Sequence, residues 1–282
     1  MSESKKVVYD VGMHRGEDTD FYLKKGFKVI AFEADPDLAE SCRKRFSEHL
    51  KSNQLTIVEG AIVDMERYKG QDKIRFFKNT VTSVWGTVVD DWAERNNKLG
   101  AQSEIIEVPI VDFSECLKTH GIPYYLKIDI EGMDVICLKA LRNFVERPEY
   151  ISIESEKVSF EKLTEEFNIF KELGYDTFQI VNQTKITSNR EPRNSSEGSF
   201  ADYKFLKGAT GLFGTDLKRN AWQSHEKSMS RYRTIFKGYR LLGDDAPVNK
   251  FFLGRVVSKS MNRLFGIPGW YDTHAKHSSV KS

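Results

Sequence analysis

The chain has 282 residues, 39% of them hydrophobic, which suits one globular domain with an elaboration or two small domains. A formal net charge of +2 identifies no class of partner, and three scattered cysteines exclude a disulfide framework. No apolar run approaches the roughly 18 residues of a membrane-spanning helix, and the polar start of the chain leaves no room for a signal peptide. We therefore expect a cytoplasmic protein without a transmembrane segment.

Strand and helix patterns alternate along most of the chain. Short apolar runs bounded by turn residues predict strands at residues 7–11, 28–32, 55–58, 74–77, 105–110, 123–132, 150–153 and 177–181. Apolar residues at helical spacing predict helices that include residues 21–23, 38–46, 113–115, 135–141 and 160–173. The polar residues 80–102 are expected to form a loop. This alternation predicts an α/β fold with a doubly wound, mostly parallel sheet.

Several helix starts carry capping signals. We expect Asp18 or Thr19 to cap the first helix, which stops at Gly26. Asp35 precedes a proline and is expected to cap the second helix. Asp112 has capping-box spacing to the glutamate three residues later and predicts a short helix at that point.

The composition of the chain changes near residue 182. Residues 183–198 are polar and rich in turn formers, so we expect a linker or loop after a domain of residues 1–182. In residues 199–282, lysine and arginine outnumber aspartate and glutamate and alternate with aromatic residues. We expect this C-terminal extension to be partly helical, to pack on the domain as a candidate substrate cap, and to fray from His277 onward.

Residues 251–265 form an amphipathic pattern within this extension. Apolar residues fall on one helical face, while Arg255, Lys259 and Arg263 form a basic stripe. The pattern is typical of a surface helix packed on the core. A basic stripe that contacts an anionic surface, such as lipid, polysaccharide or a nucleotide sugar, is the alternative interpretation.

The motif of greatest interest follows the first strand. Asp10, Gly12 and Gly16 form an Asp-x-Gly-x-x-x-Gly pattern, and Glu33 ends the next strand. Glycines let the backbone approach a ligand, a helix start offers free N–H groups, and the acid can accept ribose hydroxyls. His14 stands where a dinucleotide fingerprint needs a middle glycine, which makes a nicotinamide dehydrogenase the weakest interpretation. Alternatively, the glycines only make a tight turn.

Two signatures in the chain resemble a known family. Residues 9–19 together with residues 31–36, and separately residues 126–134, are similar to signatures of the FkbM family of S-adenosylmethionine-dependent methyltransferases. The resemblance extends over residues 7–181. It implies a Rossmann-like class I methyltransferase fold, S-adenosylmethionine as cofactor, and a hydroxyl of a sugar, glycan or other small molecule as methyl acceptor.

The resemblance also implies roles for individual residues. Asp10 and Gly12 would line the methionine end of the cofactor, with Gly16 at the turn. His14 departs from the asparagine usual in the family, and we expect it either to bond the cofactor carboxylate or to bond backbone within the turn. Glu33 would bind the ribose hydroxyls. The residues that would flank the adenine are Ala34, Ala61 and Ile62.

Candidate catalytic groups lie in the second signature. Lys127, Asp129 and Glu131 alternate along a predicted strand, which places them on one face at the carboxyl end of the sheet. A carboxylate there can act as general base on an acceptor hydroxyl. Together with Glu154 it could instead bind a divalent metal, which we do not favour. The simplest alternative is an ion pair that only shapes the crevice.

A second candidate base lies near the end of the chain. The glycine-rich residues 208–214 and the aromatic–acid–histidine residues 270–274 could form an acceptor lid with His274 as base, or could simply anchor the terminal segment. A non-catalytic cofactor- or glycan-binding module is a rival function. Nucleic-acid methylation is less favoured, because the chain lacks the Asp/Asn-Pro-Pro-Tyr run that amino-methylating enzymes of this fold tend to carry.

Overall fold

A computed structural model describes residues 6–79, 86–89, 103–130, 132–156, 159–242 and 269–281. The strands are β1 (Val7–Val11), β2 (Lys28–Glu33), β3 (Leu55–Glu59), β4 (Ala61–Ile62), β5 (Lys73–Asn79), β6 (Ser103–Val111), β7 (Tyr125–Ile128), β8 (Tyr150–Glu154), β9 (Tyr175–Asn182), β10 (Gln223–Ser224) and β11 (Tyr271–His277). The helices are α1 (Glu17–Lys24), α2 (Pro36–Arg45), α3 (Ser47–Lys51), α5 (Phe113–His120), α6 (Asp134–Ala140), α7 (Phe160–Glu172) and α8 (His225–Leu242). Short 3-10 helices are η2 (Leu141–Asn143), η3 (Gln183–Ser188), η4 (Gly214–Asp216) and η5 (Arg219–Ala221).

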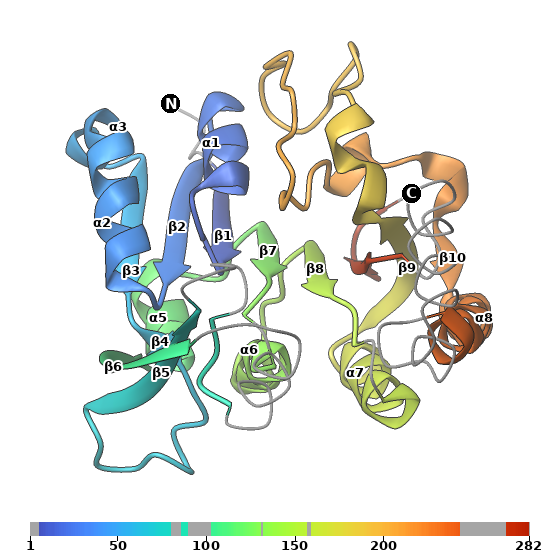
Figure 1. Ribbon diagram of the computed structural model, residues 1–282. Helices are drawn as coiled ribbons and strands as arrows, with labels where there is room; N and C mark the ends of the chain where they lie inside the picture. Colours follow the sequence, from blue (N-terminus) through green and yellow to red (C-terminus); the bar gives the residue numbers. More distant parts are fainter. Residues whose placement is uncertain are drawn as a thin grey trace, which may run out of the picture.

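The strands form one large and one small sheet. The eight-stranded sheet has the order β10-β9-β11-β8-β7-β1-β2-β3, and the three-stranded sheet has the order β4-β6-β5. In the large sheet, β3, β2, β1, β7 and β8 are parallel, whereas β10 and β11 pair antiparallel with their neighbours. The carboxyl ends of β1 and β2 point toward the small sheet (Figure 1). The predicted doubly wound, mostly parallel fold is confirmed.

Each face of the large sheet has its own hydrophobic core. Alternate residues of β1 point to opposite faces, so Tyr9 and Val11 pack with apolar residues of α5 to α8. Val8 packs on the other face with residues of α1 and α2. Aromatic residues of the segment 203–213 complete this second core.

The strand predicted at residues 123–132 is shorter than expected. β7 ends at Ile128, and the Asp129 N–H makes a last bond to the Val11 carbonyl at 2.9 Å. The Ile130 N–H then donates to the side chain of Asp134, which turns the chain away from the sheet. The other predicted strands are confirmed with small changes of bounds. Glu131, the predicted helix at residues 251–265 and most of the predicted loop 80–102 lie outside the described residues.

The start of α1 also differs from the prediction. Gly16, in the left-handed conformation, precedes the helix, which begins at Glu17. Neither Asp18 nor Thr19 caps it: Asp18 accepts bonds from a distant loop, and the Thr19 hydroxyl donates to Asp10 at 2.6 Å. The helix starts earlier because the glycine makes the turn. The predicted caps of α2 and α5, at residues 35 and 112, are confirmed.

β11, close to the end of the chain, is an internal strand of the large sheet. β11 lies antiparallel between β8 and β9, so the prediction of a frayed tail from His277 is wrong. The Ser278 N–H still donates to the Gly174 carbonyl beyond the strand. β11 carries few apolar residues, and several of its buried polar groups bond to partners from other elements. Thr273, for example, contacts the hydroxyls of Ser155 and Tyr232.

The polar segment expected as a linker is tied to α1 by buried charges. The Lys25 ammonium pairs with the Glu191 carboxylate, and both side chains are fully buried. Lys25 also donates to the Ser195 hydroxyl at 2.6 Å. In Figure 1, residues beyond η3 lie beside α1, where the Tyr203 hydroxyl donates to Asp20. None of the helices in the described part of the chain has the length and hydrophobicity that a membrane crossing needs.

Replacing Lys25 tests this packing. Lys25→Met leaves Glu191 as a buried, uncompensated charge, so we expect a loss of about 3–5 kcal/mol in the free energy of unfolding measured in urea. The neighbouring Lys24 is 54% exposed and pairs with Asp20 at the surface. Lys24→Met is therefore the matched control, with an expected change of about 0.5 kcal/mol or less. Equal effects of the two substitutions would contradict the buried pair.

Candidate active site

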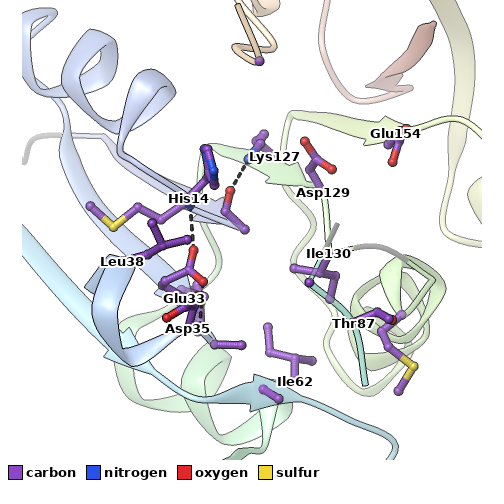
Figure 2. Close-up of a pocket in the computed structure, with 18 of the residues that line it drawn as sticks. His14, Glu33, Asp35, Leu38, Ile62, Thr87, Lys127, Asp129, Ile130 and Glu154 are labelled. Atoms are coloured by element: carbon purple, nitrogen blue, oxygen red, sulfur yellow. Dashed lines mark hydrogen bonds between the residues drawn. The ribbon is translucent and has the colours of Figure 1, made fainter. Parts of the chain in front are cut away.

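A cavity of about 350 Å³ opens at the carboxyl ends of β1, β2, β7 and β8 (Figure 2). β1 pairs with β2 on one side and with β7 on the other, so the winding of the sheet reverses at this point. Ligands of doubly wound sheets bind at such a reversal. The cavity therefore lies where the fold favours a binding site.

Most residues singled out from the sequence meet in this cavity. The predicted residues that line it are Gly12, His14, Glu33, Ala34, Ala61, Ile62, Lys127, Asp129 and Glu154. Asp10 is fully buried and contacts one of the lining residues instead. Gly16 packs against Phe46, where an added Cβ would come within 2.5 Å of the ring.

Gly12 makes the turn at the end of β1. Its φ is +86°, a left-handed value that L residues avoid. A Cβ at this position would lie 1.8 Å from the Asp129 carbonyl oxygen. The N–H groups of Gly12 and Met13 donate to the Phe32 carbonyl at 3.1 and 2.8 Å. The turn is therefore in direct contact with the ends of both neighbouring strands.

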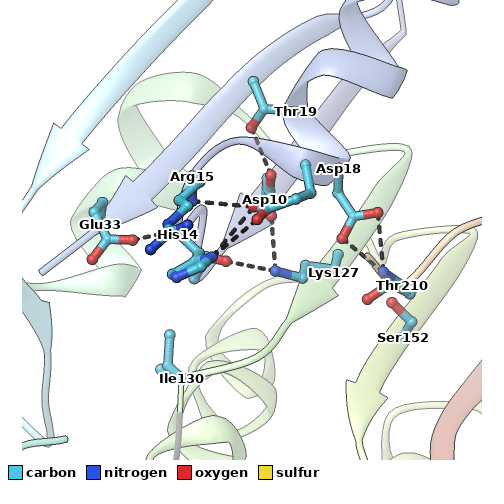
Figure 3. A network of polar contacts seen from close by, with 12 residues as sticks. Asp10, His14, Arg15, Asp18, Thr19, Glu33, Lys127, Ile130, Ser152 and Thr210 are labelled. Carbon is cyan, nitrogen blue, oxygen red and sulfur yellow. Dashed lines mark hydrogen bonds and ion pairs between the residues drawn. The ribbon is translucent and has the colours of Figure 1, made fainter. Parts of the chain in front are cut away.

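A buried ion pair lies next to this turn and bonds to it (Figure 3). The Lys127 ammonium lies 3.0 Å from the Asp10 carboxylate and donates to the Gly12 carbonyl at 2.6 Å. Burial disfavours the charged lysine, but the carboxylates of Asp10, Asp129 and Asp18 outweigh it and raise the pKa of Lys127. The ammonium therefore keeps its proton and holds the turn; it does not accept a proton.

Glu33 is held at the cavity wall by backbone groups. One carboxylate oxygen accepts from the His14 N–H at 2.7 Å, and the other accepts from the Asp35 N–H at 2.8 Å. Burial raises the pKa of Glu33 to about 7, although both hydrogen bonds act in the opposite direction. Because the pKa of Glu33 lies near neutral pH, hydrogen bonds from the hydroxyls of a ligand can shift this carboxyl to its ionised form.

The His14 ring faces an acid that the sequence analysis did not single out. His14 has a left-handed φ of 51°, and its Nδ1 lies 3.2 Å from a carboxylate oxygen of Glu17. Burial opposes ionisation of Glu17, but the bond with His14 lowers the pKa of this carboxyl overall. Glu17 is therefore ionised at neutral pH in the first turn of α1.

The far end of the cavity carries carboxylates and an indole. Asp129, Glu154 and Trp270 line it together, and Figure 2 shows Asp129 with Lys127 on one side and Glu154 on the other. Burial and the charges of Asp129 and Glu154 raise the pKa of nearby Asp272. The buried Trp270 Nε1 has no hydrogen-bond partner within the described part of the chain. This donor can be satisfied by a ligand.

His274, the alternative base, lies outside the residues that line the cavity. It is a buried residue of β11, opposite Ser152 of β8 and Gln179 of β9. Burial lowers the pKa of His274 to about 3, so the ring is neutral. This placement agrees with the anchoring role of the terminal segment and not with a base that faces an acceptor in this cavity.

Further lining residues come from segments without a ligand signature. Phe76 and Thr87 belong to or pair with the small sheet, and Lys207 belongs to the C-terminal segment. Among the lining residues for which the sequence predicted no role, only Glu17 carried a usable signal. It begins the helix directly after the glycine motif. In the described ranges, no three His, Cys, Asp or Glu side chains are arranged to hold a metal ion.

Comparison with known proteins identifies the family. Residues 10–177 match the family model of the methyltransferase FkbM domain. The chain belongs to the FkbM methyltransferase family. Its sheet is accordingly the Rossmann-like class I methyltransferase fold, and its cofactor is S-adenosylmethionine. The resemblance found in the sequence is thereby confirmed.

Individual relatives of this FkbM methyltransferase are distant. A stretch of 59 residues is 37% identical to the probable ribosomal RNA small subunit methyltransferase A of Haloarcula marismortui, but it spans only 21% of each chain. Precorrin-6y C5,15-methyltransferase of Geobacter metallireducens is 12% identical, with 98% of this chain and 82% of that chain covered and a TM-score of 0.39. A methyltransferase of Geobacter sulfurreducens in complex with S-adenosylhomocysteine is also 12% identical, with 98% and 86% covered and a TM-score of 0.36.

The steric role of Gly12 can be measured by substitution. Gly12→Ala adds a Cβ that collides with the Asp129 carbonyl, so we expect it to destabilise the protein by clearly more than the ~1–2 kcal/mol of a left-handed L residue. Gly70 has a similar φ of +77° and open space around it. Gly70→Ala should therefore show the conformational cost alone. Urea unfolding compares the two, and equal losses would argue against the close contact at Gly12.

Proposed function

We propose that this methyltransferase methylates a hydroxyl group of a sugar, glycan or other small polyhydroxylated molecule. The observation that supports this acceptor best is the chemistry of the far end of the cavity. Asp129 and Glu154 offer acceptors for hydroxyl protons, and Trp270 offers an indole whose N–H has no hydrogen-bond partner among the described residues. Carboxylates bind hydroxyl donors, and an aromatic face packs on the apolar C–H face of a sugar ring.

In this function, the cofactor lies across the switch point of the sheet, between the ends of β2 and β7. Glu33 accepts hydrogen bonds from the ribose hydroxyls, because its two oxygens are already oriented by backbone N–H groups. The apolar side chains of Ala34, Ala61 and Ile62 then lie against the adenine. The methionine end lies over the turn at Gly12. S-adenosylmethionine, when bound, supplies the methyl group as a sulfonium.

The ionisation of Glu33 makes the affinity for the cofactor depend on pH if the ribose lies at this residue. Ribose hydroxyls bond the ionised carboxylate, so binding lowers a pKa that is about 7 in the free protein. We expect the affinity for S-adenosylhomocysteine, measured by calorimetry, to increase from about pH 6 to about pH 8. Glu33→Gln should weaken binding by about 1.5–3 kcal/mol and abolish this increase.

Glu59 provides the matched control for this measurement. It ends the neighbouring strand β3 and pairs with Arg43 at 2.7 Å, outside the cavity lining. Glu59→Gln should keep the affinity and the pH dependence of the wild type. If Glu33→Gln kept that dependence as well, Glu33 would not contact the ribose.

Asp129 is the proposed general base. The acceptor oxygen forms a bond to the methyl carbon as the sulfur–carbon bond breaks, and the hydroxyl proton passes to the Asp129 carboxylate. The positive charge of Lys127 attracts the Asp129 carboxylate, because Asp129 is one of the carboxylates that raise the pKa of Lys127. Glu154 and Trp270 orient the acceptor through its neighbouring hydroxyls. The in-line arrangement of the acceptor oxygen, the methyl carbon and the sulfur then depends on how these residues position the acceptor.

Substitution of Asp129 separates catalysis from binding. Asp129→Asn keeps the size of the side chain but removes the base, so we expect kcat to fall by about 10²–10⁴-fold. The Kd for S-adenosylmethionine should remain that of the wild type. The assay follows methyl transfer to a panel of monosaccharides and oligosaccharides by mass spectrometry. Glu154→Gln is the comparison variant and should raise the KM for the acceptor more than it lowers kcat. An undiminished kcat in Asp129→Asn would refute the role of Asp129 as general base.

A nucleic-acid acceptor has less support from this cavity. Binding of nucleic acid depends on cations that neutralise phosphates. The groups at the acceptor end are instead the carboxylates of Asp129 and Glu154, next to the buried Asp272. The short match to a probable ribosomal RNA methyltransferase covers a fifth of either chain and does not change this preference.

A further inference from the structure

A lysine from outside the matched family domain lines the cavity. Lys207 and Gly208 contribute to its wall, although the family match ends at residue 177. The cavity wall thus includes a loop of the C-terminal segment, on the side where Glu17 and Asp18 of α1 also line it. This is the end over which the methionine part of the cofactor lies in the proposed function.

The loop that carries Lys207 is fixed to α1 by hydrogen bonds. The Thr210 N–H donates to both oxygens of Asp18 at 3.1 and 2.8 Å, and the Gly211 N–H donates at 3.2 Å (Figure 3). Asp18 is buried, so these bonds replace its contacts with water. The position of Lys207 beside the first turn of α1 is therefore set by α1 itself.

The charged side chains at this end of the cavity differ in whether they already have partners. The Lys127 ammonium is already bound to Asp10 and to the Gly12 carbonyl. The His14 ring is turned to Glu17. Lys207 is exposed and forms no ion pair with any residue in the described part of the chain. It is therefore a lining cation that remains available for an anionic group.

The methionine part of the cofactor carries two opposite charges on one carbon. An ionised Glu17 suits the α-ammonium group, and a lysine that has no ion pair within the described residues suits the α-carboxylate. The positive end of the helix dipole of α1 adds to the attraction for the carboxylate. We propose that Lys207 binds the α-carboxylate of S-adenosylmethionine while Glu17 binds its ammonium group. This inference rests on the cofactor placement in the proposed function.

The consequence concerns the C-terminal segment as a whole. A segment outside the matched domain would complete the cofactor site, in addition to any role around the acceptor. The hydrogen bonds between Asp18 and residues 210–211 would then anchor the loop that holds Lys207 over the cofactor. His14, the other residue considered for this carboxylate, would act through its backbone N–H on Glu33.

Two ligands that differ only in the amino-acid part test the proposal. S-adenosylhomocysteine carries the α-carboxylate, whereas 5′-methylthioadenosine has the same nucleoside and a thioether but lacks the amino-acid group. Both are titrated by calorimetry into the full chain. We expect Lys207→Met to weaken S-adenosylhomocysteine binding by about tenfold or more and to leave methylthioadenosine binding unchanged. Lys207→Arg should retain most of the affinity.

Lys204→Met serves as the matched control, because Lys204 is an exposed lysine of the same segment that does not line the cavity. It should bind both ligands like the wild type. An unchanged affinity of Lys207→Met for S-adenosylhomocysteine, an equal loss for both ligands, or an effect on the acceptor KM alone would each overturn the proposal. If the wild type bound neither ligand, the proposed function itself would fail. The titrations of the wild type therefore separate this failure from a failure of the proposal for Lys207.

Discussion

The buried ion pair between Asp10 and Lys127 is the interaction on which the cavity depends. The two residues are direct neighbours in the register of β1 and β7, so pairing of the strands brings their charges together. An unpaired charge at this depth would be strongly unfavourable, and removal of one partner leaves the other uncompensated. The Gly12 carbonyl satisfies a further donor of the ammonium. The glycine turn is thereby fastened to β7, the strand that ends directly before the candidate base Asp129.

From this pair the polar contacts extend outward in both directions. On one side, Glu33 ties the end of β2 to the turn through the His14 N–H. On the other side, Thr19 bonds Asp10, and the adjacent Asp18 holds the loop at residues 210–211. The same few carboxylates therefore order the backbone around the cavity. A cofactor that enters meets groups that are already oriented, which reduces the entropy lost on binding.

Local patterns predicted the central part of the sheet and singled out the residues that are proposed to bind the cofactor. Strand alternation placed β1 and β2, and the glycine spacing with Glu33 pointed to a nucleotide-like ligand. The sequence could not show the pairing of Asp10 with Lys127, because it depends on the register of two strands far apart in the chain. β11 was missed for a related reason: its polar residues are buried by partners on both sides, and hydropathy does not detect such a strand.

The least predictable part of the site comes from long-range packing. Trp270 and Lys207 line the cavity only because β11 inserts between two strands and because Asp18 binds a distant loop. No spacing along the chain signals either contact. The expectation of a C-terminal extension that packs on the domain followed from the basic composition of these residues. Composition reports charge and says little about the place in a sheet at which a segment inserts.

A crystal structure of the full chain with S-adenosylhomocysteine tests the central claim most directly. The account predicts the ribose hydroxyls on Glu33, the adenine against Ala61 and Ile62, and the sulfur facing the side of the cavity that holds Asp129. A cofactor whose ribose lies away from Glu33, or whose sulfur points away from Asp129, would contradict it.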